Sequence, residues 1–263
     1  MRVILNADDF GFDADTVRAT IECFEQGGLT SATIMANMDA TAEALAYAKE
    51  NPQFSFGAHL TFSSDGPERP VLPPSSIPGL VDETGRFLDP VQVRTRALRN
   101  VLPVDEIARE MEAQLGVLVD HGIALSHVDS HGHLHKFKPF RAAMAIILPK
   151  FGITRVRNVQ NIYLRAPLRS PTYWLSGFWR RRIMSLFATT PHFFMPTSAG
   201  DKKWIRPLLQ RTFDGALEVG VHPGYAEPWR DQERAACIRF GAAARDAGWK
   251  AVCWNRVKVA SPR

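Results

Sequence analysis

The sequence has few cysteines and no long apolar run, and both facts restrict the kinds of protein it can be. Its three cysteines are far apart and show no CxxC spacing, so they predict reduced core residues rather than a disulfide framework; they are Cys23, Cys237 and Cys253. No apolar stretch approaches the roughly 20 residues that a membrane-spanning helix needs. The N-terminal segment reaches a carboxylate at Asp8, which argues against a signal peptide. We therefore expect a cytoplasmic protein.

Positive charge is in modest excess and is concentrated in one segment. The formal net charge is +5, and the basic residues gather between Arg155 and Arg182. The aromatic residues of that segment lie in an apolar helical pattern without a recognisable nucleic-acid-binding motif, so we expect no nucleic-acid partner. The chain of 263 residues is 45% hydrophobic and shows no internal repeat, which favours one large core and a single domain over residues 1–263.

Short apolar strands alternate with amphipathic helices along the chain. The expected strands span 2–7, 31–36, 54–60, 124–135, 153–158, 192–197, 216–222 and 249–254. The expected helices span 13–26, 41–49, 103–120, 140–151, 202–212 and 232–246. About eight strands in such alternation predict an α/β fold, with a closed or nearly closed parallel β/α barrel favoured over an open doubly wound sheet.

Two segments interrupt this alternation. Residues 61–90 contain six prolines and are too long for an ordinary connection, so they predict a lid or binding loop after the third strand. Residues 159–190 form an insertion rich in arginine and aromatic residues, with SPTYWLSGFWRRRIMSLF at 170–187. This composition is typical of an interfacial helix that makes peripheral membrane contact. It is more typical of a surface helix that packs on the barrel while its arginines extend into solvent.

The segment HVDSHGHLH at 127–135 places ionisable side chains at every second position, namely His127, Asp129, His131, His133 and His135. In an extended strand these five side chains would point in one direction. A polar, solvated strand end is the simplest interpretation, but clustered histidine and aspartate favour a metal or proton-transfer site. Two residues of a strand advance about 6.5 to 7 Å, so one ion cannot bind all five. One would be a ligand, and the others would orient it or touch substrate.

Other polar residues also follow predicted strands. Asp8 and Asp9 follow the first strand, His59 ends the third, and His222 ends a late one. The carboxyl ends of parallel strands meet at one rim, where functional groups gather, although an Asp-Asp pair alone is also typical of a turn or helix cap. One carboxylate and two imidazoles with open positions for water form a common catalytic metal arrangement.

Four motifs in this order, NADDFG (6–11), GAHL (57–60), HVDSHGHLH (127–135) and HPG (222–224), resemble those of the YdjC-like carbohydrate deacetylases. This family includes chitooligosaccharide deacetylases and a branch associated with hopanoid biosynthesis. The resemblance implies a distorted TIM-like β/α barrel and metal-dependent removal of acetyl from an N-acetylated sugar. It matches Asp9, His59 and His131 to the family's metal ligands, Asp8 to its proposed base and His222 to a histidine near the reacting centre. The longer loop after GAHL and the basic insertion depart from the sugar-degrading members.

The chemistry of amide hydrolysis is consistent with these assignments. We expect one divalent ion, zinc or magnesium, at Asp9, His59 and His131, where it would activate water and polarise the acetyl carbonyl. Asp8 would accept the water proton, or would only orient a ligand. His222 would protonate the departing amine, or would stabilise an oxyanion, or would be structural before Pro223.

Two other kinds of function remain open from the sequence. A metal-dependent phosphoesterase or other hydrolase on the same rim would favour two ions and more carboxylate ligands. A non-catalytic protein would instead bind a lipid or a saccharide through the insertion. The expected substrate is an N-acetylated saccharide or a glycolipid, and a homodimer is compatible with the sequence.

Overall fold

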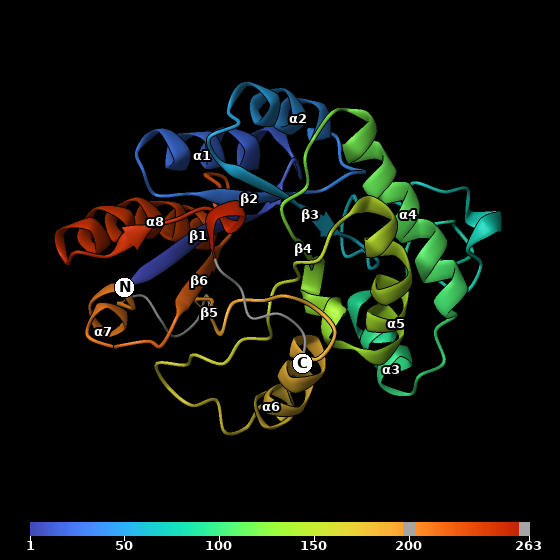
Figure 1. The fold of residues 1–263 in the computed structure, drawn as a ribbon. Coiled ribbons are helices and arrows are strands. Elements are labelled where there is room, and N and C mark those ends of the chain that lie inside the picture. Colours follow the sequence, from blue (N-terminus) through green and yellow to red (C-terminus); the bar gives the residue numbers. More distant parts are fainter. Residues whose placement is uncertain (197–202, 258–263) are drawn as a thin grey trace.

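A parallel β-sheet lies at the centre of the molecule, and helices surround it (Figure 1). The computed structural model describes residues 1–196 and 203–257, so Thr197 and Lys202, each at the end of a predicted element, lie outside the described residues. The strands are β1 (Arg2–Phe10), β2 (Ser31–Ile34), β3 (Ser55–Leu60), β4 (Val128–Ser130), β5 (His192–Phe194), β6 (Ala216–Val221) and β7 (Lys250–Ala251). Their order is β4-β3-β2-β1-β6-β5, with β7 also pairing β1, and every pair is parallel.

The sheet curls so that its two ends are linked by isolated bridges. Val156 bridges Val128 of β4, and the adjacent Arg155 bridges Ala188, which shortly precedes β5. The segment predicted as a strand at 153–158 therefore makes isolated bridges in place of a regular ladder. The result is a distorted TIM-like barrel, which confirms the α/β fold predicted from the alternation of strands and helices.

Eight α-helices cover the sheet in the described residues. They are α1 (Ala14–Glu25), α2 (Thr41–Glu50), α3 (Pro90–Leu98), α4 (Val104–Asp120), α5 (Lys138–Ile147), α6 (Pro171–Met184), α7 (Ile205–Leu209) and α8 (Pro228–Asp246). Short 3₁₀ turns span Pro74–Ser76, His131–Lys136, Leu148–Phe151 and Trp254–Arg256. Proline occupies the first turn of α3, α5, α6 and α8, where its missing N–H costs no intrahelical bond. None of the helices in the described ranges is long and apolar enough to cross a membrane.

Strand β1 shows how the barrel separates an apolar layer from a polar interior. Val3 and Leu5 belong to the large core between the sheet and the helices. Ile4, on the opposite face, belongs to a small cluster with Ala216 and Trp254 near the amino ends of the strands. Further along that same face come Asn6 and Asp8, which are buried polar residues. Because strand side chains alternate, the interior becomes polar toward the carboxyl ends of the strands, where the site lies.

The predicted strand at 124–135 is wrong beyond Ser130. The chain leaves β4 there and enters the 3₁₀ turn His131–Lys136, inside which Gly132 and His133 have φ angles of 62° and 55°. Glycine adopts this left-handed conformation without steric cost. The left-handed backbone ends the alternation of side chains that a strand would give. The expectation that all five ionisable residues of the segment point in one direction is therefore also wrong.

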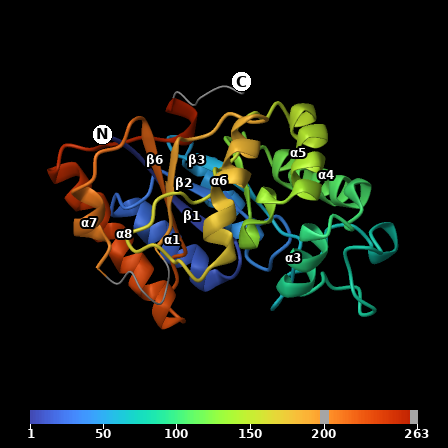
Figure 2. The ribbon, with the colours of Figure 1, turned by 90° about the horizontal axis from the view of Figure 1, so that it is seen from below.

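The two unusual segments are both folded against the barrel. In the proline-rich loop 61–90, Val81 and Phe87 form an antiparallel bridge, and Ile77 is fully buried. The insertion 159–190 contains α6, whose Trp179 is buried and packs edge-on against Phe137 at a ring distance of 5.4 Å. Figure 2 shows α6 between α3, α4 and α5 on one side and α7 and α8 on the other. Loop 61–90 also leads directly into α3, which was not predicted.

Candidate active site

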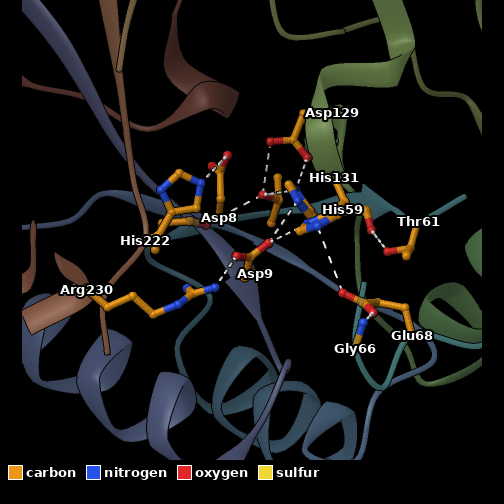
Figure 3. Close-up of polar contacts among 12 residues, drawn as sticks. Asp8, Asp9, His59, Thr61, Gly66, Glu68, Asp129, His131, His222 and Arg230 are labelled. Carbon is orange, nitrogen blue, oxygen red and sulfur yellow. Dashed lines mark hydrogen bonds and ion pairs between the residues drawn. The ribbon is translucent and has the colours of Figure 1, made fainter. Parts of the chain in front are cut away.

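Three side chains from three strand ends converge at the rim of the barrel. Asp9 Oδ1 lies 3.1 Å from His59 Nε2 and 3.1 Å from His131 Nδ1 (Figure 3). A register shift between Ala7 and Phe10 and a φ of 58° at Asp9 mark a bulge at the end of β1. Bulges re-aim side chains at the rims of barrels, and this one lets the consecutive Asp8 and Asp9 both line the site. The structure thus brings together the three residues that the sequence assigned to a metal.

The donor set fits a divalent ion. The ligand atoms of Asp9, His59 and His131 all lie within 4.8 Å of one another, which is compatible with bonds of roughly 2.0 to 2.2 Å from each to a single ion. The other ring nitrogen of His59, Nδ1, lies 2.7 Å from Asp129 Oδ1. A carboxylate behind a metal-binding imidazole fixes its tautomer and orientation, so Asp129 would orient His59.

A second carboxylate, Glu68, stands behind His131. Its Oε1 lies 4.0 Å from His131 Nε2, while its Oε2 accepts hydrogen bonds from Ser64 Oγ and from the backbone N–H of Gly66. Glu68 is almost fully buried although it belongs to the proline-rich loop. The sequence analysis missed it, because a single acidic residue in a loop carries no pattern.

Arg157 is the centre of an ion network inside the barrel, and the sequence analysis missed it as well. The buried guanidinium donates to both oxygens of Asp8 at 2.6 and 2.7 Å, and to Glu218 Oε1 at 2.8 Å. Its Nη1 also lies 2.5 Å from Asp129 Oδ2. Although burial alone would raise the pKa of Asp8, the charge of Arg157 holds that pKa well below its usual range. Asp8 is therefore an ionised carboxylate at neutral pH.

His222 lies across the rim from the metal-binding residues. Its Nε2 is 3.9 Å from Asp8 Oδ2, and its Nδ1 is 3.1 Å from Glu233 Oε2 of α8. Glu233 also accepts the backbone N–H of His222 at 2.8 Å, so this imidazole is held at two points. Burial lowers the pKa of His222, but the hydrogen bond and charge of Glu233 outweigh it and raise the pKa. Glu233 is a third residue that the motifs did not reveal.

Arg230, in the first turn of α8, completes the surroundings of Asp9. Its Nη2 donates to Asp9 Oδ2 at 2.8 Å, and its guanidinium lies 4.6 Å from the ring centre of Trp229. The two oxygens of Asp9 therefore have separate partners, with Oδ1 facing the imidazoles and Oδ2 facing Arg230.

The remaining histidines of the 127–135 segment occupy different surroundings. His127 stacks on Trp254 at a ring distance of 4.5 Å, below the polar network, and burial lowers its pKa well below the usual value. His135 Nδ1 lies 2.8 Å from Ser130 Oγ, and burial lowers the pKa of His135 too. His133 lines the cavity above the site. Of the four residues expected to orient ligands or touch substrate, the structure therefore brings Asp129 and His133 to the site and places His127 and His135 in other contacts.

A cavity of about 690 Å³ opens above these residues. This volume falls within the range of small-molecule sites. Its walls come from β1, the proline-rich loop, the turn after β4 and the start of α8. The lining includes Asp8, Asp9, His59, Glu68, His131, His133, His222, Trp229 and Arg230.

Comparison with known proteins gives consistent results. The family model described as YdjC-like protein matches residues 2–259. A protein named carbohydrate deacetylase from Brevibacillus brevis is 32% identical over 230 residues, covering 86% of this chain and 83% of its own length. A protein of the same name from Listeria monocytogenes is 31% identical with the same coverage.

Among solved structures, a proposed cellobiose-phosphate cleavage protein from Enterococcus faecalis superimposes with a TM-score of 0.75. The match covers 96% of this chain and 97% of that one at 21% identity, so it supports the fold. Because the family model spans almost the whole chain and both of these deacetylases exceed 30% identity, the resemblance seen in the four motifs is confirmed. The chain belongs to the YdjC-like protein family.

Proposed function

We propose that this protein is a metal-dependent hydrolase that removes the acetyl group from an N-acetylated sugar or glycoconjugate. The observation that carries the proposal is the convergence of Asp9 Oδ1, His59 Nε2 and His131 Nδ1 at the floor of an open cavity. The name carbohydrate deacetylase, borne by relatives that match most of the chain, supports the substrate class.

The chemistry of the ligands favours zinc over magnesium. Two of the three donor atoms are imidazole nitrogens, which suit zinc, whereas magnesium prefers oxygen ligands. When bound, such an ion would polarise the acetyl carbonyl and lower the pKa of water toward about 7. Asp129 and Glu68 would orient the two imidazoles, and Arg230 would leave a single oxygen of Asp9 free for the ion.

Asp8 and His222 are the candidates for proton transfer. Asp8 is ionised, as a proton acceptor must be, and its Oδ2 faces His222 across the rim. Each carboxylate oxygen has about two lone pairs, so the contact with Arg157 leaves Oδ2 able to accept a proton from water. Glu233 keeps His222 protonated to higher pH and aims its Nε2 at the site, where it would donate a proton to the departing amine.

The substrate would be a free saccharide or the sugar headgroup of a glycolipid. The cavity is open, polar at its floor and bordered by Trp229, which offers an aromatic surface beside the polar groups that would bind a sugar. We place the reaction in the cytoplasm, because the three cysteines are unpaired, as expected in a reducing compartment.

A phosphoesterase is the second candidate, and one observation favours it. Asp65, Glu68 and His131 form another group that could hold an ion, directly beside the first. Two ions roughly 3.5 to 4 Å apart are typical of phosphoryl-transfer sites. One bound metal per chain and no release of phosphate from sugar phosphates would exclude this function.

The deciding experiment measures metal content and acetate release together. Protein stripped with a chelator and reloaded with zinc should release acetate from N-acetylglucosamine oligomers, nucleotide sugars or N-acetylglucosaminyl lipids. His131→Ala removes one of three ligands and should abolish both metal retention and acetate release. His121→Ala, which removes an exposed histidine after α4, is the matched control and should alter neither. If His131→Ala keeps one zinc per chain, the ligand assignment is wrong.

A further inference from the structure

A second hollow, separate from the cavity above Asp9, lies between α3, α5 and α6 and has a volume of about 660 Å³. We call it the α6 groove; it is lined by Ala97, Leu98, Asn100, Phe137, Lys138, Arg141, Ala142, Leu175, Phe178, Trp179, Arg182, Ser185 and Leu186. In Figures 1 and 2, α6 lies beside α3 and α5. Three of these lining residues are cationic and none is acidic, so the groove is apolar and positively charged.

Two cations beside the groove, Lys136 and Arg141, are half-buried and buried respectively, whereas Arg94, Lys138 and Arg182 around them are exposed. Arg141 is only 7% exposed, and Lys136 is packed 5.2 Å from the ring centre of Trp179. Within residues 1–196 and 203–257, no aspartate or glutamate pairs with Arg94, Lys136, Lys138, Arg141 or Arg182, whereas other arginines such as Arg109 and Arg234 do form ion pairs. A buried charge without a counter-ion is costly.

The pKa values of these groups reflect their burial and the repulsion between neighbouring cations. Burial lowers the pKa of Arg141, and the charge of Arg182 lowers it further. Burial, followed by the charge of Arg94, lowers the pKa of Lys136 to about 8. A bound anion would reduce both the cost of burying these cations and the repulsion between them, because it would supply the missing opposite charge.

The apolar walls determine what kind of anion fits. Leu98 is 60% exposed, and Leu175 and Phe178 of α6 and Leu186 just after it are 42 to 46% exposed. A simple phosphate or carboxylate would leave this surface in water, whereas an attached hydrocarbon chain would cover it at about 25 cal/mol per Å² of apolar area buried. We propose that the α6 groove binds a single anionic amphiphile, whose carboxylate or phosphate head pairs with Arg141 and Arg182 and whose chain lies along α6.

Other occupants fit these observations less well. A second copy of the chain on the same face of a two-fold dimer would place Arg182 and Lys138 against the same cations of its partner. The flat surface of a bilayer would meet the exposed leucines but not Arg141, which is recessed among them. Only an individual molecule can reach the buried cation and cover the walls at once. The proposal does not rest on the reaction at the metal-binding residues.

Calorimetric titration with dodecanoate, dodecanol and acetate tests this proposal. Dodecanoate should bind one per chain, while dodecanol lacks the charge and acetate lacks the chain, so both should bind at least about tenfold more weakly. Arg141→Met and the exposed Arg182→Met should each weaken dodecanoate about 10- to 100-fold, the range expected for lost hydrogen bonds to a charged group. Arg206→Met, an exposed arginine of α7 outside the groove, should bind like the wild type.

The melting temperature of each variant distinguishes a loss of binding from a loss of folding. Arg141 donates to the backbone carbonyl of Lys136 but has no carboxylate partner, so Arg141→Met exchanges one hydrogen bond for the removal of a buried charge and should change the melting temperature little. Arg182 is exposed and should tolerate replacement. Equal binding of dodecanoate and dodecanol by all variants would overturn the proposal in favour of a plain apolar surface. Association with phosphatidylglycerol vesicles without any binding of monomeric dodecanoate would overturn it in favour of a membrane surface.

Discussion

At the scale of single residues, each reactive side chain of the candidate site is held by a buried or half-buried partner. Arg157 holds Asp8 and Glu233 holds His222 from outside the sequence motifs, whereas Asp129, which holds His59, belongs to the motif at 127–135. Such partners fix tautomer, orientation and charge, and their loss typically costs 10- to 100-fold in metal affinity or activity. Two predictions separate the roles of Asp8 and His222.

Asp8→Asn should retain the metal and lose about 10²- to 10⁴-fold in kcat, because a general base contributes this much and an amide cannot accept the proton. Arg157 keeps Asp129 and Glu218 as partners in this variant, so the fold should persist. Single-turnover acetate release and elemental analysis on the same sample measure both quantities. Near-normal turnover by folded, zinc-loaded Asp8→Asn would remove the base assignment.

Glu233→Gln should shift the alkaline limb of the pH profile of kcat/KM to lower pH. In the wild type, Glu233 raises the pKa of His222, so the protonated acid persists to higher pH and activity declines only above that raised pKa. Removing the negative charge of Glu233 lowers the pKa of His222, so the decline of kcat/KM should begin at a lower pH. Well below that pKa, kcat/KM should change little. Asp246→Asn, an exposed change at the far end of α8, is the control. An unchanged alkaline limb in Glu233→Gln would mean that His222 is not the acid.

At the scale of secondary-structure elements, the close packing of α8 on the first β/α unit keeps His222, Glu233 and Arg230 near Asp9. Gly241 in α8 permits this approach, because a Cβ there would lie 2.4 Å from the backbone oxygen of Gly27. Backbone atoms cannot move aside as a flexible side chain can. Gly116 in α4 is the opposite case, since a Cβ there would meet nothing within 4 Å.

The two helical glycines should therefore respond oppositely to alanine. Gly241→Ala should lower the free energy of unfolding by about 1 to 3 kcal/mol through overpacking. Gly116→Ala should raise it by about 0.5 to 1 kcal/mol, because alanine has the better helix propensity and no new contact forms. Urea denaturation of both variants measures the difference. A neutral Gly241→Ala would show that α8 can shift away from α1 at little cost.

At the scale of the whole molecule, the polar interior of the barrel is held by one guanidinium. Arg157 pairs with Asp8 of β1, with Glu218 of the neighbouring β6 and with Asp129 of β4, which lies three strands away from β1 in the sheet, so a single buried cation joins distant parts of the sheet. Three carboxylates for one arginine leave an excess of negative charge. Burial raises the pKa of Glu218 to about 7, only partly opposed by Arg157.

This excess makes Glu218 a source of pH-dependent instability in the metal-free protein. Its pKa is raised from 4.5 in the unfolded chain to about 7, so the neutral form stabilises the fold below pH 4.5 and this contribution is lost as pH rises through 7. Glu218→Gln keeps an oxygen acceptor for Arg157 without the charge. It should be more stable than the wild type at pH 8, by on the order of 1 to 3 kcal/mol, and nearly equal at pH 4.5.

Urea denaturation of the chelator-treated protein at both pH values measures this effect. Glu83→Gln, an exposed change in loop 61–90, should show no such dependence. A loss of stability at pH 8 in Glu218→Gln would show that Glu218 is ionised and that its pairing with Arg157 outweighs its burial.

The sequence by itself determined the class of fold and the rim at which polar residues gather. Alternating apolar strands and amphipathic helices are local patterns, and they sufficed for the parallel β/α barrel, which the structure confirms. The motifs also predicted which carboxylate and imidazoles would meet, and the structure brings Asp9, His59 and His131 together, while their role as ligands stays a prediction. This much was accessible because the carboxyl ends of parallel strands converge whatever lies between them.

Only the tertiary structure decided which groups stand behind those residues. Glu68, Arg157, Glu218 and Glu233 lie in a loop, an irregular segment, a strand and a helix without any shared spacing, and their contacts with the site depend on distances across the barrel. The turn after Ser130 was missed for a related reason. Alternating histidines favour a strand by period alone, yet the left-handed conformations at Gly132 and His133 turn the chain so that His131 faces Asp9 while His135 bonds back to Ser130. Periodicity reports which face of a regular element is buried, and it carries no information once the backbone leaves that element.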